Sequence, residues 1–409
     1  MKPDVELLRG KHILVGISGG IAAYKIPELI RLLRKAGAEV QVTTTKNALE
    51  FVTCLTLQTL SGHRVYSDVF AAINEHSTEH ISLPDWADMM VVAPATADVI
   101  GKMAAGVADD ALTTTFAAMR KPVLVAPAMN DKMYASPATQ QAISTLAAWD
   151  NVTMLECAEG ELACGTTGKG RMQEVDTIFA AVEYVLSPKP LAGKRVLITA
   201  GPTQEAIDPV RYISNSSTGK MGYALARTCL RLGAEVILVT GPTALSMRPW
   251  QAFAPLTVEP IRSAQEMCEA TMAAFAQTDI AILCAAVADF TPSDPADHKI
   301  KKQQGQTSLT IEMTTTQDIA ALLGQRKQHH QHLVGFALET NNELANAERK
   351  MVSKHLDMIV LNSLQDKGAG FGTDTNKVTL LYPNGIRKEL PLESKAVVAD
   401  EIVGAVLEL

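Results

Sequence analysis

A pattern of strand, polar loop and helix occurs twice in this chain and constrains its fold more than any other feature. The second copy runs from Gly193 to Gly222 as GKRVLITAGPTQEAIDPVRYISNSSTGKMG. The apolar run Val196–Ile198 predicts a buried strand, and an apolar periodicity over 224–232 predicts a helix. The loop between them presents backbone N–H groups close to a helix start, an arrangement that favours anions.

The first copy begins at Gly10 and has the same order in a shorter form. Its strand leads to Ser18-Gly19-Gly20, and an amphipathic helix is predicted over 21–36. The glycines that precede the second strands are Gly37 and Gly233, and the second copy is 13 residues longer up to that point. We therefore expect two α/β units of the Rossmann-like, doubly wound class, with mostly parallel sheets.

The length of 409 residues exceeds that of a typical single core and supports two domains. The stiff connector Ser187-Pro188-Lys189-Pro190 indicates the boundary, so domains are expected at 1–190 and 191–409. A net charge of −7 argues against a general nucleic-acid binder. The absence of a membrane-length apolar run, of a signal-length N-terminal segment and of a C-x-x-C pair predicts a cytoplasmic protein with reduced thiols.

The first half lacks the G-x-G-x-x-G fingerprint, and a Ser-Gly-Gly turn alone is equally compatible with a purely structural tight turn. Binding of NAD also calls for an acidic residue at the end of the second strand, where this chain has Thr43-Thr44-Thr45. Hydroxyl groups suit a phosphate or a polar ring edge. This pattern therefore favours a flavin mononucleotide over NAD.

The segment His76-Ser77-Thr78-Glu79-His80 matches H-x-x-E-H, a zinc-protease pattern that requires both histidines on one helix face. The next residues, Ile81–Pro84, are predicted to be extended because they end in a proline. That prediction disfavours zinc. A surface histidine pair and a catalytic histidine both remain open.

A glycine-rich stretch from Cys157 to Met172 predicts a flap that contains Cys164. A lone cysteine is by default buried and inert. A thiol in a flexible loop with Lys and Arg nearby is more often accessible and reactive. The setting favours the functional interpretation for Cys164.

In the second half, the predicted strand Ile280–Cys284 is followed by an acidic residue and then by Lys299-Ile300-Lys301-Lys302. Such a charge run is usually a solvated edge. An acid and a lysine cluster near a phosphate-binding loop also meet the needs of a Mg-nucleotide. Gly219-Lys220 is not a P-loop, because Met221 replaces the metal-binding Ser or Thr.

Taken in order, the motifs resemble the bacterial family of bifunctional phosphopantothenoylcysteine decarboxylases and phosphopantothenate–cysteine ligases of coenzyme A synthesis. The resemblance covers essentially the whole chain. The motifs that carry it are SGGIAAYK at 18–25, HISL at 80–83, PAMNDKM at 127–133, ACGTTGKGRM at 163–172, DPVRYISNSSTGKMG at 208–222, AAVADF at 285–290 and KIKK at 299–302.

For the first domain the resemblance implies a flavodoxin-like, FMN-dependent decarboxylase. His80 would act in oxidative decarboxylation, Asn130 would bind the substrate, and Cys164 would protonate the intermediate. Ala163 and Gly165 would belong to the substrate flap. The residues implied to hold FMN are Ser18, Gly19, Gly20, Thr45, Pro94 and Thr96.

For the second domain the resemblance implies a CTP-dependent ligase that forms an acyl-cytidylate. Lys299 would serve the first half-reaction with Mg²⁺ on the triphosphate, Asn215 would orient the acyl-cytidylate, and Arg211 would support the loop or a substrate phosphate. The Mg²⁺ ligands stay unassigned. The residues implied to contact CTP are Cys284, Ala285, Asp289, Lys299, Asp318, Ile319, Phe336, Lys350 and Lys354.

The family also implies a homo-oligomer, with trimer-based dodecamers of the decarboxylase and dimers of the ligase. Two positions depart from its pattern. Asp98 stands where the family often has Asn, and the usual Asn-Pro-Asp appears as Thr316-Gln317-Asp318. A non-enzymatic regulatory flavoprotein of the same fold and an NAD(P)-dependent reductase are the alternatives.

Overall fold

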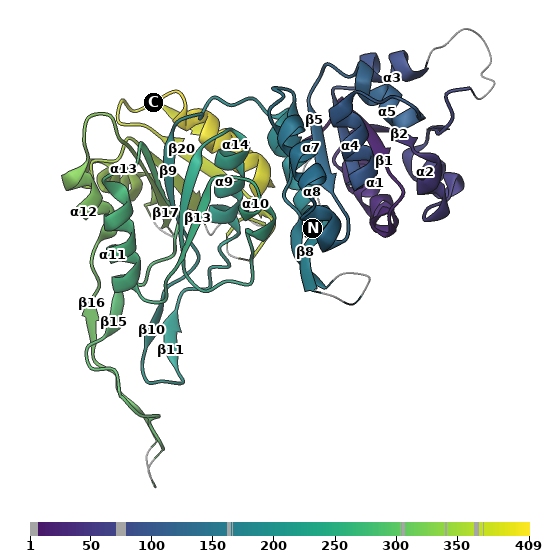
Figure 1. The fold of residues 1–409 in the computed structure, drawn as a ribbon. Coiled ribbons are helices and arrows are strands. Elements are labelled where there is room, and N and C mark those ends of the chain that lie inside the picture. The colour runs from purple at the N-terminus through teal and green to yellow at the C-terminus, as the bar shows by residue number, and fades with distance from the viewer. Residues whose placement is uncertain are drawn as a thin grey trace. The chain divides into compact units, whose positions relative to one another are not determined.

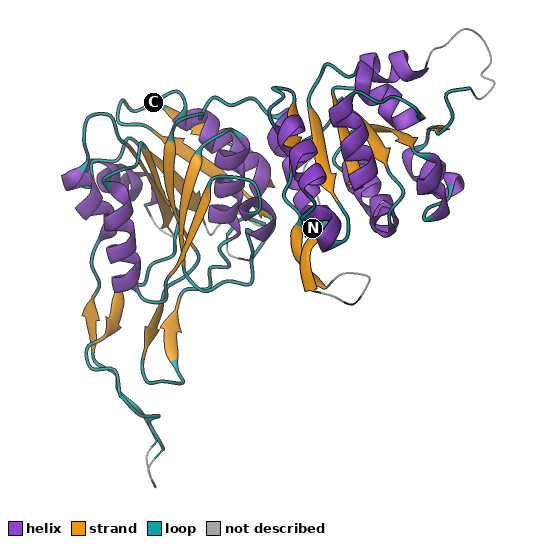
Figure 2. Cartoon of the chain, viewed as in Figure 1, coloured by secondary structure: helices purple, strands orange, loops and turns teal. Residues whose placement is uncertain are grey.

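The computed structural model describes residues 7–70, 79–161, 165, 167–302, 304, 307–339, 342–363, 368–370 and 372–409. It divides into two compact units (Figures 1 and 2). The first comprises Met1–Ser187 with Arg248–Phe253, and the second comprises Pro188–Met247 with Ala254–Leu409. Within the described part of the chain no helix is long and apolar enough to span a bilayer.

The first unit is built on a six-stranded parallel sheet with the order β3-β2-β1-β4-β5-β6. Its strands are β1 (His12–Ile17), β2 (Glu39–Thr44), β3 (Val65–Tyr66), β4 (Met89–Ala95), β5 (Val123–Pro127) and β6 (Val152–Met154). Without the short edge strand β3, the order renumbers to 2-1-3-4-5, the flavodoxin-like arrangement. The winding direction reverses between β1 and β4, which is where such sheets bind ligands.

Helices cover both faces of this sheet because β1 is apolar on both of its sides. Ile13, Val15 and Ile17 share one core with helices α1, α2 and α8. Leu14 belongs to the opposite core, with helices α3, α4, α5 and α7. The bounds are α1 Ile26–Lys35, α2 Cys54–Ser61, α3 Glu79–Trp86, α4 Ala97–Ala105, α5 Ala111–Ala118, α6 Asp131–Tyr134, α7 Pro137–Ala147, α8 Val175–Leu186 and α10 Arg248–Gln251, with 3-10 turns at Ile21–Lys25 and Lys46–Glu50.

Two local predictions for this unit differ from the structure. The helix expected over 21–36 is helical over 21–35, but its first part is a 3-10 turn and α1 begins beside Pro27, a residue suited to a first helical turn. Ile81–Pro84, predicted to be extended, lies within α3. Pro84 lacks an N–H, but burial of Leu83 in the core shared with α5 overrides that local preference.

The second unit is built on an eight-stranded sheet with the order β13-β12-β9-β14-β17-β18-β20-β21. Its strands are β9 (Arg195–Ala200), β12 (Glu235–Thr240), β13 (Leu256–Pro260), β14 (Ile280–Leu283), β17 (His332–Glu339), β18 (Met358–Ser363), β20 (Val378–Leu381) and β21 (Arg387–Glu389). The first six are parallel and follow the doubly wound order, with the reversal between β9 and β14. The predicted terminal hairpin is confirmed as antiparallel β20 and β21.

Helices again cover both faces of this sheet (Figure 1). Helices α11, α12 and α13 share one core with the sheet, while α9 and α14 pack together and α9 lies against β9 and β12. Ser394 caps α14 by accepting from the Val397 N–H. The bounds are α9 Lys220–Arg231, α11 Ala264–Phe275, α12 Ile319–Arg326, α13 Glu343–Ser353 and α14 Lys395–Val406.

The long loop predicted after β9 contains a small hairpin of β10 (Gln204–Ala206) and β11 (Tyr212–Ser214). Helix α9 begins at Lys220, earlier than predicted, because Gly219 takes a left-handed φ of 77° and turns the chain into the helix. A second pair, β15 (Phe290–Pro292) and β16 (Met313–Thr315), extends into an arm that runs away from the sheet (Figure 1). The remaining strands are β7 (Ala158–Glu161), β8 (Thr167–Arg171), β19 (Thr375–Asn376) and β22 (Glu393–Ser394).

Candidate active sites

In the first unit, Ser18 joins the loops that follow β1 and β4 at the point where the winding reverses. Its hydroxyl donates to the Pro94 carbonyl at 2.7 Å and accepts from the Thr96 N–H at 3.0 Å. Ser18 is fully buried. Ser18 therefore fixes the position of Thr96, whose own side chain makes no capping bond at the start of α4.

Gly19 lies where no side chain fits. A Cβ there would come within 2.5 Å of the Asn47 Cβ and 2.9 Å of the Asn47 carbonyl carbon. Gly20 has somewhat more room, since its nearest neighbour would be the Thr96 methyl at 3.2 Å. The turn after β1 can approach the loop after β2 only because its second residue is glycine.

A cavity of about 600 Å³ opens at this edge of the sheet, and three of the predicted cofactor residues line it: Gly19, Thr45 and Thr96. The Thr45 hydroxyl is buried and has no hydrogen-bond partner among the described residues. The same holds for the hydroxyls of Thr43 and Thr44. Buried hydroxyls normally have partners, and a bound polar ligand would supply one for Thr45. The residues present therefore fit the flavin mononucleotide that the sequence suggests.

Lys102, which no sequence motif indicates, also lines this cavity. Its Nζ lies 3.3 Å from Asp98 Oδ2 and 3.1 Å from Asp109 Oδ1. Burial acts to lower the pKa of Lys102, but the hydrogen bonds to the two carboxylates outweigh it, so the pKa lies above its usual value. Asp98, the departure from the family pattern, thus belongs to an ion-pair cluster at the rim of the cavity.

Asn130 lies at the start of α6, where its Oδ1 accepts from the Lys132 N–H at 2.9 Å. The hairpin of β7 and β8 packs on this segment, since the Met129 N–H donates to the Gly170 carbonyl at 2.9 Å. A Cβ on Gly170 would lie 2.4 Å from the Met129 oxygen, so only glycine permits this approach. The base of the predicted flap therefore lies beside Asn130.

Ala163 and Cys164 lie outside the described residues, while Gly165 is exposed with a left-handed φ of 80°. The other cysteine of this stretch, Cys157, is buried and its Sγ lies 3.5 Å from the Pro127 carbonyl. Burial raises the pKa of the Cys157 thiol to about 12. Cys157 is therefore an inert thiol at neutral pH.

His80 lies in α3, a helix that packs against α5, and it does not line the cavity described above. His76, the other histidine of the H-x-x-E-H pattern, lies outside the described residues. Within the described ranges no group of three or more His, Cys, Asp or Glu side chains could hold a metal ion.

In the second unit, a cavity of about 310 Å³ opens where the winding reverses between β9 and β14. Four of the predicted site residues line it, Asn215, Cys284, Ala285 and Phe336, together with the start of α9 at Gly219–Gly222. Gly222 cannot carry a side chain, because a Cβ would lie 2.5 Å from the Ala200 Cβ. The helix start therefore packs directly on the end of β9.

Asn215 ties the inserted loop to the chain that follows β14. Its Nδ2 donates to the carbonyls of Ala286 and Val287, both at 3.1 Å. The amide group of Asn215 is thereby held at the cavity wall, with its oxygen making no hydrogen bond to the described residues.

Arg211 does not line this cavity and instead joins the inserted loop to the arm. Its Nε donates to Asp208 Oδ2 at 3.0 Å, and its Nη2 donates to the Ile300 carbonyl at 2.7 Å. The Ile300 N–H donates to the same Asp208 oxygen at 3.0 Å. Hydrogen bonds from Arg211 hold the pKa of Asp208 well below its usual range, against the effect of burial.

Lys299 is exposed on the arm next to Ile300 and does not line the cavity. Asp289 is exposed, and its carbonyl accepts from the Thr316 N–H at 3.0 Å. This bond is made by the backbone of Thr316, the first residue of the 316–318 departure, and Asp289 does not line the 310 Å³ cavity.

Of the other predicted nucleotide contacts, Asp318 caps α12 and its Oδ2 lies 2.9 Å from the Lys354 Nζ. Ile319 is buried in the core. Lys350 lies in α13, whereas Lys354, predicted to share its helix face, is the residue that ends the helix. None of these four residues lines the 310 Å³ cavity. In the described structure, the residues implied to contact CTP therefore do not all line one cavity.

Two lysines that line this cavity were not predicted as site residues, Lys220 and Lys395. Lys220 belongs to the Gly219-Lys220 pair, which is not a P-loop because Met221 follows it. Nothing in the sequence marks Lys395, which is the first residue of the last helix, α14.

Comparison with known proteins accounts for both units. Residues 2–187 match the family model described as Flavoprotein, and residues 191–409 match the model described as DNA/pantothenate metabolism flavoprotein C-terminal domain. A coenzyme A biosynthesis bifunctional protein CoaBC from Bacillus subtilis is 48% identical over 406 residues, which cover 98% of each chain.

Two further relatives cover less of the chain. A cysteine/cysteine sulfinic acid decarboxylase from an unknown prokaryotic organism is 47% identical over 363 residues, 88% of this chain and 99% of that protein. The solved structure of a C-terminal domain of a coenzyme A biosynthesis bifunctional protein CoaBC is 42% identical and covers 54% of this chain and 97% of its own, with a TM-score of 0.45.

Proposed function

The chain belongs to the family of coenzyme A biosynthesis bifunctional proteins, and on that premise we propose how its residues divide two consecutive reactions. The protein is a bifunctional enzyme with a ligase and a decarboxylase activity. It ligates cysteine to 4'-phosphopantothenate and then decarboxylates the product, phosphopantothenoylcysteine, to 4'-phosphopantetheine. The full-length match to the Bacillus subtilis protein carries this assignment, supported by a cavity at the reversal point of each sheet.

The decarboxylase is assigned to the first unit, with 1–190 as the proposed domain. Gly19, Thr45 and Thr96 would hold FMN, since they line the cavity and the Thr45 hydroxyl has no other described partner. When bound, FMN supplies reversible two-electron chemistry at the substrate's thiol end, which makes loss of CO₂ easier. Asn130 would orient the substrate at the base of the flap.

After CO₂ has left, the remaining carbon needs a proton from a positioned acid. Cys164 on the flap is the proposed donor, because a thiol in a glycine-rich loop can reach the substrate and because Cys157 is buried. His80 is proposed to act in the preceding step, although α3 does not line the cavity of its own chain. We also propose a homo-oligomer in which two copies of the chain contribute residues to one decarboxylase site.

The ligase is assigned to 191–409, with CTP and Mg²⁺ as the proposed cosubstrate and metal. A carboxylate oxygen of phosphopantothenate attacks the α-phosphate of CTP and releases pyrophosphate. The amine of cysteine then attacks the acyl carbon and releases CMP. Both reactants of the first step are anions, so cations must offset their repulsion.

Asn215 is proposed to orient the acyl-cytidylate from the cavity wall, and Lys299 to offset charge in the first step. Arg211 is proposed to act through its hold on the loop and the arm, because it bonds Asp208 and the Ile300 carbonyl rather than lining the cavity. A cytoplasmic location completes the proposal.

The test is incubation of the purified protein with 4'-phosphopantothenate, cysteine, CTP and Mg²⁺, followed by mass spectrometry. We expect phosphopantetheine, CMP and pyrophosphate, with phosphopantothenoylcysteine accumulating when the flavin is removed. Replacing CTP by ATP tests the nucleotide separately. Absence of phosphopantothenoylcysteine in every arm would overturn the ligase assignment.

A parallel incubation with cysteine alone addresses the similarity to the cysteine/cysteine sulfinic acid decarboxylase. We expect no cysteamine under these conditions, because the proposed substrate is the ligated product. Cysteamine formed from free cysteine at a rate equal to that of phosphopantetheine would contradict the proposed substrate.

A further inference from the structure

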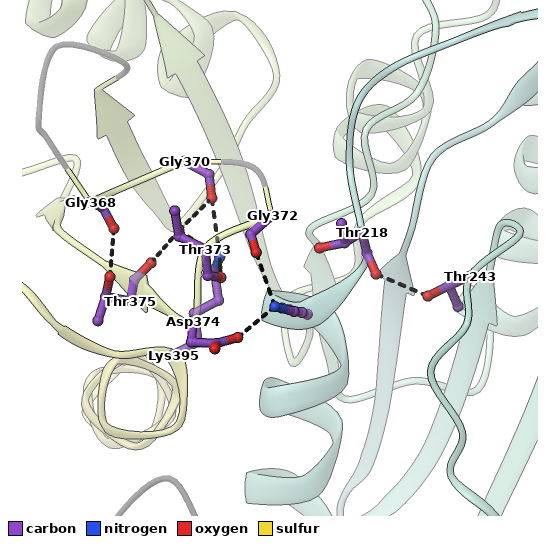
Figure 3. Close-up of polar contacts among 10 residues, drawn as sticks. Thr218, Thr243, Gly368, Gly370, Gly372, Thr373, Asp374, Thr375 and Lys395 are labelled. Carbon is purple, nitrogen blue, oxygen red and sulfur yellow. Dashed lines mark hydrogen bonds and ion pairs between the residues drawn. The ribbon is translucent and has the colours of Figure 1, made fainter. Parts of the chain in front are cut away.

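One wall of the second unit's cavity is made largely of backbone. Gly370 and Gly372 line the cavity and both have left-handed φ angles, 110° and 76°. These glycines belong to a short segment whose described residues are 368–370 and 372–375. In it, the Thr373 hydroxyl lies 3.1 Å from the Gly370 carbonyl and 2.9 Å from the Thr375 carbonyl (Figure 3). The Thr375 hydroxyl donates to the Gly368 carbonyl at 2.6 Å. A glycine-rich segment of this kind has much backbone freedom and few side chains to restrain it.

Two lysines at the first positions of two helices, Lys220 and Lys395, donate hydrogen bonds to this segment, and Figure 3 shows Lys395 beside it. Lys395 of α14 donates from Nζ to the Gly370 carbonyl at 3.1 Å and also to the Thr373 carbonyl. Lys220 of α9 donates to the Gly372 carbonyl at 3.0 Å and pairs with Asp374. The segment is therefore fastened to the two helices that pack together on one face of the sheet.

Lys395 is only 8% exposed, and among the described residues it forms no ion pair with a carboxylate. Its acceptors are neutral carbonyl and hydroxyl oxygens. Burial lowers the pKa of Lys395 and the Lys220 charge acts in the same direction, while Asp374 and the Cys284 thiol oppose them. A buried cation without a carboxylate is costly, and an apolar side chain would fill the same space at lower cost.

We propose that Lys395 is a positioning residue for the ligation reaction, and that its ammonium group holds the backbone carbonyls of Gly370 and Thr373 at the wall of the nucleotide cavity. Lys220 provides the second fastening from α9. The inference rests on the proposed function of this cavity as the nucleotide site. It assigns Lys395 no contact with the reacting atoms.

The expected consequence concerns affinity more than chemistry. Without its fastening the segment samples many conformations, and a nucleotide must order it on binding. Ordering roughly one residue's backbone weakens binding about tenfold. The change should therefore appear in the Kd and KM for CTP, while kcat at saturating CTP changes less.

The experiment uses the full-length holoenzyme with Lys395→Met, which keeps the length and the apolar stem but removes the charge. CTP binding is measured by calorimetry, and ligation is followed by pyrophosphate release. We expect the Kd and KM for CTP to rise about tenfold or more, with partial recovery in Lys395→Arg. Lys388→Met is the matched control, because Lys388 is exposed, pairs with Glu401 and does not line the cavity.

Two further readouts separate positioning from a loss of folding. In Lys395→Met, decarboxylation of supplied phosphopantothenoylcysteine should stay at the wild-type rate. Lys220→Met should also raise the Kd for CTP. In the double variant with Lys395→Met, the two increases should be less than additive in free energy, because both lysines hold the same segment. Unchanged CTP affinity in Lys395→Met would overturn the inference. So would an equal loss of melting temperature and CTP affinity in Lys395→Met, Lys220→Met and the control Lys388→Met. If the wild-type protein itself binds no CTP, the proposed function of the cavity fails instead.

Discussion

The guanidinium group of Arg211 and the carboxylate of Asp208 form an ion pair in which the Asp208 side chain is buried and the Arg211 side chain is partly exposed. The Nε of Arg211 donates to Asp208 Oδ2 at 3.0 Å, and the Asp208 side chain is fully buried. The other Asp208 oxygen, Oδ1, accepts from the N–H groups of Val210 and Arg211, both at 2.9 Å. This pair links the loop inserted after β9 to the arm that carries Lys299.

Asp208→Asn should therefore impair ligation while leaving decarboxylation intact. The amide keeps the size of the side chain but loses the charge-assisted bonds to Arg211 and replaces one acceptor by a donor facing the Ile300 N–H. We expect ligase kcat/KM to fall about tenfold or more. Asp294→Asn, on the exposed part of the same arm, is the control and should behave as wild type. Equal ligase rates in the two variants would contradict the role assigned to Asp208.

The same pair predicts a pH dependence of stability. The pKa of Asp208 lies below its usual range in the folded protein because Arg211 hydrogen-bonds the carboxylate. A carboxyl group with a depressed folded-state pKa stabilises the fold above its unfolded pKa of about 4, and this contribution is lost as the pH falls. The stability difference between wild type and Asp208→Asn should be constant above about pH 5 and shrink below about pH 4. Denaturant titrations at several pH values measure it, and a difference that grows on acidification would refute the sign.

Gly19→Ala should remove the flavin from the first unit. The added methyl would lie 2.5 Å from the Asn47 Cβ, so either the turn after β1 or the loop after β2 must move, and both border the cavity. We expect a colourless protein with little absorption in the visible flavin band and no decarboxylase activity. Gly101→Ala is the matched control, since its Cβ would meet nothing within 4 Å, and a helical Gly→Ala change should stabilise α4 by up to about 1 kcal/mol.

The two cysteines of the flap region should behave in opposite ways. Cys164→Ser should still release CO₂ but form no aminoethanethiol product, because the oxidative half-reaction precedes protonation. Cys157→Ser should keep decarboxylase activity, because the Cys157 thiol is buried and its pKa is raised to about 12. Radiolabelled CO₂ release and mass spectrometry of the product measure the two halves. Loss of both CO₂ and product in Cys164→Ser would show that Cys164 acts earlier.

The two-unit α/β architecture follows from local sequence. Buried parallel strands are short apolar runs, and Ile13–Ile17 and Val196–Ile198 are such runs followed by glycine-containing turns and helices. Where the prediction failed, as for Ile81–Pro84, a tertiary contact outweighed a local preference. Leu83 gains enough burial in the core to keep a proline inside a helix.

The candidate site was only partly predictable for the same reason. The resemblance implied Asn215, Ala285 and Phe336 as site residues, and all three line one cavity. Parallel topology accounts for part of this, because Ala285 follows β14 and Phe336 lies in the neighbouring strand β17. Lys102, Lys220 and Lys395 could not, since their roles depend on partners rather than on neighbours in the chain. Lys220 meets Asp374, a residue 154 positions away, only because α9 and α14 pack on the same face.

The sequence by itself determined that this chain repeats one α/β plan, that its second copy carries an insertion, and that polar residues follow the buried strands. These properties are local, since apolar periodicity and glycine positions specify them within a few residues. Only the tertiary structure decided that Arg211 holds the arm through Asp208 and that Lys395 fastens Gly370. Such contacts arise when distant segments are packed together, and the free energy that selects them comes from the two cores.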